Sequence, residues 1–103
     1  MSQFPEVIHL NVGGTLFVTK LVTLRKYKNS ILGEMFNGQI IPDQDKDGNY
    51  FIDRNGKYFD HIIEFLRDEN YLPPVEVVME VIKEADYYIL KKYMDRLNRM
   101  QPL

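Results

Sequence analysis

Hydrophobic and polar residues alternate near the start of the chain. Apolar side chains occupy every second position from Ile8 to Val12, within the segment Val7 to Val12. This alternation is typical of a strand with one buried face. The following Gly13-Gly14 pair supplies the positive φ angles of a two-residue turn. We therefore expect a second strand, Thr15 to Thr19, to return beside the first.

The turn also fixes which side chains share a face of this hairpin. With a two-residue loop, Leu10 lies opposite Phe17, which places Phe17 on the apolar face. Leu16 and Val18 then point to the other face. These two aliphatic side chains need cover from another element.

Short helices are expected between the hairpin and the middle of the chain. The segment Leu21 to Tyr27 favours one or two helical turns. Asn29 or Ser30 can cap a helix that runs to about Phe36 and stops at Asn37-Gly38.

Helical periodicity resumes at Asn55 and continues almost to the end. Apolar residues recur there at i, i+3, i+4 and i+7, the spacing of one buried helical face. Pro73-Pro74 precedes the second of three such groups, and an interruption near Asp86 to Tyr88 separates it from the third. The last two groups therefore predict two helices at an angle. The groups are Phe59, Ile62, Ile63 and Leu66; Val78, Val81, Ile82 and Ala85; and Leu90, Tyr93, Met94 and Leu97.

The remaining segments complete an α+β pattern. The polar stretch Gln39 to Asn49 contains Pro42 and Gly48 and is typical of a surface loop, and Tyr50 to Asp53 is typical of a short strand. The sequence predicts a small mixed sheet of three to four strands with about five helices around it, in one domain.

Composition narrows the possible functions. The chain has 103 residues, 45% of them hydrophobic, which is enough for one modest core. Its net charge of −2 with both signs interspersed argues against nucleic acid or an anionic membrane as partner. There is no apolar run that could span a bilayer, no signal peptide at the start and no Cys. We expect a cytoplasmic protein without disulfides.

The acidic stretch between Asp43 and Gly48 is the strongest candidate for chemistry. Calcium loops of the EF-hand type place acidic oxygens at positions one, three and five and Gly at position six, and Asp43, Asp45, Asp47 and Gly48 follow that spacing. The twelfth position must be a bidentate carboxylate, but here it is Arg54. A solvated acidic loop is the favoured interpretation.

Other kinds of binding or catalytic site also lack the residues that they need. Gly13-Gly14 is not followed by the Lys-Ser or Lys-Thr of a phosphate-binding loop. The two histidines, His9 and His61, lie on separate elements, and zinc would need more ligands than they supply. Carboxylates at four-residue helical steps are expected to face solvent: Asp60 and Glu64, and Glu76, Glu80 and Glu84. We expect no enzyme activity, no cofactor, no metal and no small-molecule substrate.

An ordered set of motifs resembles a known family. It includes Ile8-His9-Leu10-Asn11-Val12-Gly13-Gly14, Met35-Phe36, Tyr50-Phe51-Ile52-Asp53-Arg54, Phe65-Leu66-Arg67 and Glu84-Ala85-Asp86-Tyr87-Tyr88. The order and spacing resemble BTB/POZ domains of the potassium-channel tetramerisation type, found in KCTD proteins and in voltage-gated potassium channels. The resemblance implies a BTB/POZ domain over residues 6–98 with tails at 1–5 and 99–103. This chain departs from the family in having Lys28 where Pro is usual, and it lacks the Cys and His set that binds interface zinc in some channels.

The resemblance implies self-association into tetramers or pentamers through flat, polar faces. It also implies, by analogy with many KCTD adaptors, recruitment of a cullin scaffold for ubiquitin ligation. A potassium-channel assembly domain is an alternative, and a calcium-responsive or enzymatic domain is a more distant one.

Two groups of residues are assigned to these contacts. Arg54 could bond across a subunit contact or pair within the chain with a carboxylate such as Asp60. Phe36 could anchor a cullin, although core burial is the competing fate of that ring. The expected oligomer interface contains Asn11, Asp53, Arg54, Asp60 and Arg67, and the expected cullin-facing surface contains Met35, Phe36, Asn37, Gln39 and Ile41.

Overall fold

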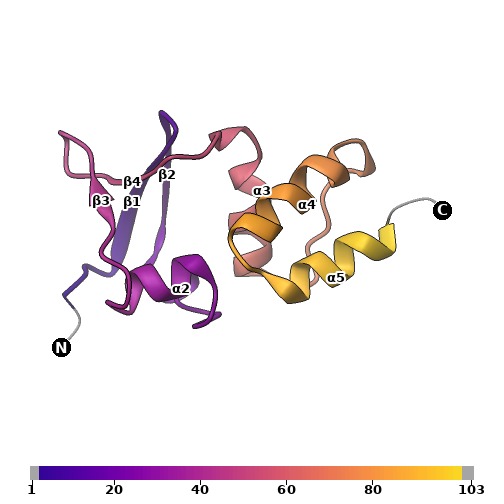
Figure 1. The fold of residues 1–103 in the computed structure, drawn as a ribbon, viewed down its shortest axis with the longest axis horizontal. Coiled ribbons are helices and arrows are strands. Elements are labelled where there is room, and N and C mark those ends of the chain that lie inside the picture. The colour runs from indigo at the N-terminus through magenta and orange to yellow at the C-terminus, as the bar shows by residue number, and fades with distance from the viewer. Residues whose placement is uncertain (1–2, 101–103) are drawn as a thin grey trace.

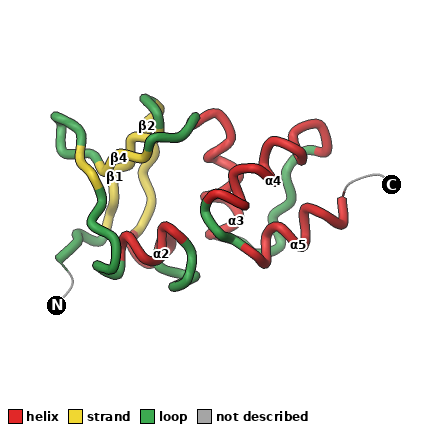
Figure 2. Tube along the Cα trace, in the orientation of Figure 1, coloured by secondary structure: helices red, strands yellow, loops and turns green. Residues whose placement is uncertain are grey.

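The computed structural model describes residues 3–100, which form an elongated body of about 45 × 26 × 18 Å. A sheet lies at one end with α2 beside it, and α3, α4 and α5 gather at the other end (Figure 1, Figure 2). In chain order the elements are β1 (Val7–Val12), β2 (Thr15–Lys20), α1 (Leu21–Leu24), α2 (Ile31–Phe36), β3 (Asp43–Gln44), β4 (Tyr50–Ile52), the 3₁₀ turn η1 (Gly56–Tyr58), α3 (Phe59–Arg67), the 3₁₀ turn η2 (Val75–Val77), α4 (Val78–Tyr87) and α5 (Lys91–Met100). The α+β class and the mixed sheet are confirmed.

The sheet has four strands in the order β2-β1-β4-β3. β1 pairs with β2 antiparallel and with β4 parallel, and β3 pairs with β4 antiparallel. Leu10 lies opposite Phe17 and Val12 opposite Thr15, so the predicted two-residue turn and its register are confirmed. β2 and β3 are the two edges of the sheet.

The hairpin turn approaches the chain after β4 closely. The Gly13 amide donates to the Ile52 carbonyl at 3.0 Å, and Gly13 has φ 58°. A Cβ at Gly13 would lie 2.2 Å from the Arg54 carbonyl oxygen, and one at Gly56 would lie 2.6 Å from the Val12 carbonyl oxygen. Glycine at both positions therefore fixes where the segment after β4 leaves the sheet.

The segment expected to be only a surface loop, Gln39 to Asn49, contains β3. This strand has two polar, exposed residues, so neither length nor hydrophobic alternation marks it in the sequence. It forms because a tight turn folds the segment back on β4. The Asp45 amide donates to the Asn49 carbonyl at 2.8 Å, and the Gly48 amide donates to the Asp45 carbonyl at 3.0 Å.

The core lies between one face of the sheet and the helices. Ile8, Leu10, Val12 and Ile52 of the sheet are all buried. Aromatic side chains link this face to the helices. Phe17 packs on Phe59 of α3 with ring centroids 5.0 Å apart, and Tyr50 packs on Phe36 of α2 at 5.3 Å.

Parts of the two predicted tails belong to the folded domain. Phe4, in the segment expected to be a tail, packs against Phe36 and Tyr50. Helix α5 continues to Met100, two residues past the expected boundary at 98. Residues 1–2 and 101–103 of the expected tails lie outside the described residues.

Helices α2, α4 and α5 begin and end close to the expected positions. The Ser30 hydroxyl caps α2 by accepting from the Gly33 amide at 3.1 Å. α4 and α5 are separate, as predicted, because the chain turns sharply at Ile89, which has φ 57°. The amides of Ile89 and Leu90 donate to the carbonyls of Asp86 and Ala85, the arrangement of a Schellman motif that usually contains Gly.

Arg54 joins the chain segment after β4 to helix α4. Its Nη2 donates to Glu84 Oε2 at 2.5 Å and its Nε donates to Glu84 Oε1 at 3.3 Å. The guanidinium also lies over the Tyr87 ring, 4.3 Å from its centroid. These hydrogen bonds to Glu84 raise the pKa of Arg54 above its ordinary value. Glu84, expected in a solvent-facing stripe, is instead buried, and Arg54 pairs with Glu84 rather than with Asp60.

Arg54→Ala should lower the free energy of unfolding by about 2–3 kcal/mol, because it leaves a mostly buried carboxylate without its partner. The matched control is Lys92→Ala, which removes an ion pair to Glu69 whose side chains are 57% and 38% exposed. That change should cost less than about 1 kcal/mol. Urea titrations at one protomer concentration compare the two variants. Equal losses would contradict a structural role for the Arg54 pair.

Candidate functional site

Potential metal-ligating side chains are dispersed in the described part of the chain. Among residues 3–100, no three His, Cys, Asp or Glu side chains are grouped to hold a metal ion. His61 Nδ1 lies 2.7 Å from the Tyr71 hydroxyl oxygen, so this ring packs against a neighbouring loop. No helix within the same residues is long and apolar enough to cross a bilayer. The candidate functional features are surfaces.

The sheet has one face that the described helices leave uncovered, which we call the open face. Val7, Leu16 and Val18 lie on it and are 46%, 65% and 50% exposed. The cross-strand register places Asn11 and Phe51 in one row with Leu16. The cover that the sequence requires for Leu16 and Val18 is therefore absent from residues 3–100. The open face is thus partly apolar, whereas the resemblance implies polar faces for self-association.

A charged stripe of α3 adjoins the open face at β2. Asp60, Glu64 and Arg67 are spaced at i, i+4 and i+7 and so lie on one side of the helix. Arg67 Nη1 donates to Glu64 at 2.8 Å, and its Nη2 donates to the carbonyl oxygen of Val18 on β2 at 3.3 Å. Apolar strand residues and charges of both signs therefore meet along this edge.

The five residues expected at an oligomer interface have different surroundings. Asp53, Asp60 and Arg67 are exposed, whereas Arg54 is partly buried against Glu84. Asn11 is also partly buried, and both ends of its amide bond within the chain: Oδ1 accepts from the Gly14 amide at 2.7 Å, and Nδ2 donates to Asp45 at 2.8 Å. The sequence assigned no role to Leu16 and Val18 at the interface, although their outward direction was already evident.

The expected cullin-facing set divides into buried and exposed residues. Met35 and Phe36 are 7% and 1% exposed, so they belong to the core and cannot contact a partner in this fold. Asn37, Gln39 and Ile41 are exposed, and Ile41 reaches 90%. Ile40, which the sequence did not single out, is 39% exposed. The sequence feature that could have identified Ile40 is the apolar pair Ile40-Ile41 within an otherwise polar loop.

The backbone holds this loop in a defined position. The amides of Gln39 and Ile40 both donate to the Glu34 carbonyl, at 3.0 and 3.1 Å. The Arg25 Nε donates to the Asn37 Oδ1 at 2.9 Å. The two isoleucines are therefore presented on an anchored segment that leads into β3.

Asp45 organises the turn between β3 and β4. Its carboxylate accepts hydrogen bonds from the side chains of Asn11 and Asn49 and from the amides of Asp47 and Asn49. These bonds, the one from Asn11 above all, lower the pKa of Asp45 from its ordinary 3.8 to about 2. The acidic stretch that resembles a calcium loop is thus a turn whose central carboxylate is already satisfied by the chain.

Asp45→Asn should lower the melting temperature, because the new amide cannot accept the bond from Asn11 in the same arrangement. The pKa of Asp45 is lower in the folded state than in the unfolded state. Its stabilising effect is therefore complete above about pH 4 and is lost as pH falls through about 2. Thermal melts from pH 7 to pH 2 should show the gap between wild type and variant closing below pH 4. A gap that is constant with pH would contradict this role.

Most of the chain is similar to known proteins. Residues 8–97 match the BTB/POZ domain family. BTB/POZ domain-containing protein KCTD21 from Mus musculus and the protein of the same name from Homo sapiens are each 41% identical to this chain over 98 residues, which is 93% of the chain. The alignment spans 38% of the length of each relative. The chain belongs to the BTB/POZ domain family and is of the KCTD type.

Proposed function

We propose that this domain is a homo-oligomerising interaction module and that copies assemble through the open face and its charged edge. The observation that carries the proposal is the exposure of Leu16 and Val18 on a regular, partly apolar sheet face. Burial of apolar surface contributes about 25 cal/mol per Å². A second copy that packs on this face would bury the apolar side chains that the described helices leave exposed.

The polar residues beside the open face give such a contact its direction. Asp60, Glu64 and Arg67 place both signs of charge along α3, and Asp53 lies exposed on the segment after β4. Charged groups at an interface contribute more to specificity and orientation than to strength. If the open face meets a different surface of the next copy, the contact is heterologous, and it closes into a ring when the rotation permits. A tetramer or pentamer would be such a ring.

Changing Leu16 and Val18 together to Glu should convert the oligomer to monomer, because both carboxylates would lose water on assembly. The matched control is Met79→Glu on α4, a residue that is 61% exposed and lies on another element. Light scattering on a size-exclusion column at tens of micromolar should give the wild type and the control a multiple of 12.2 kDa. A monomeric wild type, or an unchanged mass for the double variant, would refute the proposed contact.

We further propose that the loop residues 37–41 contact a cullin scaffold, as the resemblance to KCTD adaptors implies. Ile41 supports the proposal because an apolar side chain that is 90% exposed on an anchored loop is suited to fill a pocket of a partner. This loop leads into β3, whereas the open face includes Val18 on β2 at the opposite edge of the sheet. One protomer could therefore use both surfaces together.

Ile41→Glu should weaken capture of purified cullin scaffolds by at least roughly tenfold, the effect expected for loss of an interface anchor worth over 1.4 kcal/mol. Val75→Glu is the control, since Val75 is 59% exposed and lies on η2. Light scattering shows whether each variant keeps its oligomeric mass, which separates this contact from self-association. If no cullin is captured by the wild type, the adaptor role fails and the assembly role stands.

A further inference from the structure

Two pockets share the lining residue Lys26, and both linings are strongly basic. The larger, of about 840 Å³, lies beside β2 and α1, and the smaller, of about 370 Å³, lies between the turn before α2 and the start of α5. Lys20, Arg25, Lys26 and Arg67 line the first. Lys26, Lys28, Lys91 and Lys92 line the second. We call the two together the basic groove.

The charge of the groove contrasts with that of the whole chain. Four cations line each pocket and one is shared, so seven of the 13 Lys and Arg residues gather here, in a chain of net charge −2. Glu6 is the only carboxylate among the described lining residues. Such segregation of one sign of charge within a groove produces a local field that attracts anionic groups.

Four of the seven cations already bond within the chain, including Arg25, whose Nε donates to Asn37. Among the described residues, Arg67 pairs with Glu64 and Lys92 pairs with Glu69, at 2.8 and 3.0 Å. Lys26 donates to a backbone carbonyl, that of Leu66. Lys28 and Lys91 are exposed and pair with no described carboxylate.

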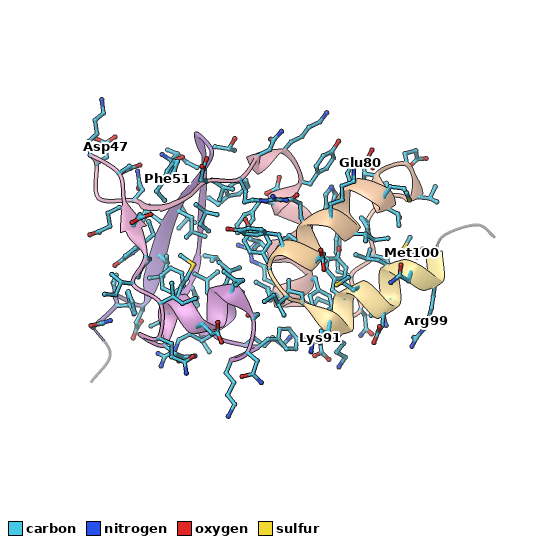
Figure 3. The ribbon with its side chains drawn as sticks, in the orientation of Figure 1. Asp47, Phe51, Glu80, Lys91, Arg99 and Met100 are labelled. Atoms are coloured by element: carbon cyan, nitrogen blue, oxygen red, sulfur yellow. The ribbon has the colours of Figure 1, made fainter. Side chains whose placement is uncertain are left out.

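Lys91 and Lys92 occupy an unfavourable helix position, although Lys92 is paired with Glu69 and Lys91 lines a further pocket together with Asp86 and Asp95. Both lie in the first turn of α5, which contains no acidic residue (Figure 3 labels Lys91). The positive end of a helix dipole disfavours cations there by about 0.3–1 kcal/mol each. A carboxylate held between these lysines would offset that repulsion.

The groove also offers apolar surface between its charges. Val22 in the larger pocket is 71% exposed, and Ile89 in the smaller pocket is 42% exposed. The smaller pocket is further lined by the rings of Tyr27 and Phe65. This mixture favours a chain that carries both carboxylates and apolar side chains over a ligand that is purely polyanionic.

We propose that the basic groove binds an acidic, amphipathic segment of a partner protein, in which Asp or Glu residues alternate with aliphatic or aromatic ones. Its carboxylates bond to Lys26, Lys28 and Lys91, and its apolar side chains cover the exposed surface between them. The groove shares Arg67 with the charged edge of the open face and Arg25 with the contact that holds loop 37–41, so the test uses residues that belong to neither. Lys28 and Lys91 lie outside both of those surfaces.

Fluorescence anisotropy of the intact chain with a fluorescein-labelled peptide that alternates Glu with Leu and Phe tests the proposal. Binding should weaken as NaCl rises from 50 to 500 mM, because exposed charges are screened. K28E/K91E should weaken binding roughly tenfold, the sum of several exposed charge contacts. Lys83→Glu, the same change at an exposed lysine of α4, should leave affinity within about twofold.

Three further measurements distinguish other occupants. Circular dichroism verifies that K28E/K91E is folded, and the milder K28Q/K91Q should show a smaller loss in the same direction. Phosphatidylserine vesicles and a single-stranded oligonucleotide should bind more weakly than the peptide. Light scattering should show no change in oligomeric mass for K28E/K91E. The proposal is overturned by absent peptide binding, equal effects of K28E/K91E and Lys83→Glu, stronger binding of vesicles or oligonucleotide, or a changed oligomeric mass.

Discussion

A sheet has two faces, and a chain of this length covers only one of them. Four strands in the order β2-β1-β4-β3 present Ile8, Leu10 and Val12 to the helices, and these residues are fully buried. The opposite positions of the same strands must then face outward, since side chains alternate along a strand. The exposure of Val7, Leu16 and Val18 follows from this limit. The open face exists because no further helix is present among residues 3–100 to lie over it.

The helical end is joined to the sheet end by one continuous cluster of buried apolar side chains, and two contacts stand out. Phe17 on Phe59 provides an apolar link, and the pairing of Arg54 with Glu84 provides a polar one. The close approach of Gly13 to the Arg54 carbonyl sets the path between them. Residues that the family resemblance associates with subunit contacts therefore also maintain the protomer. A substitution at Arg54 is therefore expected to lower the stability of the protomer itself, whatever its effect on binding to a partner.

The sequence was most informative where local pattern and turn chemistry coincide. The hairpin register followed from the Gly13-Gly14 turn and the alternation around it, and the break before α5 followed from a change of helical phase. It was least informative where the outcome depends on distant residues. In the sequence, Glu84 has the same helical spacing as carboxylates that face solvent. Its different environment depends on Arg54, which lies 30 positions away and donates a hydrogen bond to it. β3 depends on the bonds of Asp45, and the basic groove joins lysines from positions 26–28 and 91–92.

The two edge strands of the sheet, β2 and β3, also affect whether copies can associate strand by strand. A long, unpaired strand edge is a template for fibrils, because its free amides and carbonyls can accept another strand. One edge here, β3, has only two residues, and on the other edge the Val18 carbonyl is occupied by Arg67. Strand-by-strand growth is discouraged at both edges, while the open face stays free. If copies assemble as proposed, they can be brought together through the open face without offering a long free strand edge for amyloid-like growth.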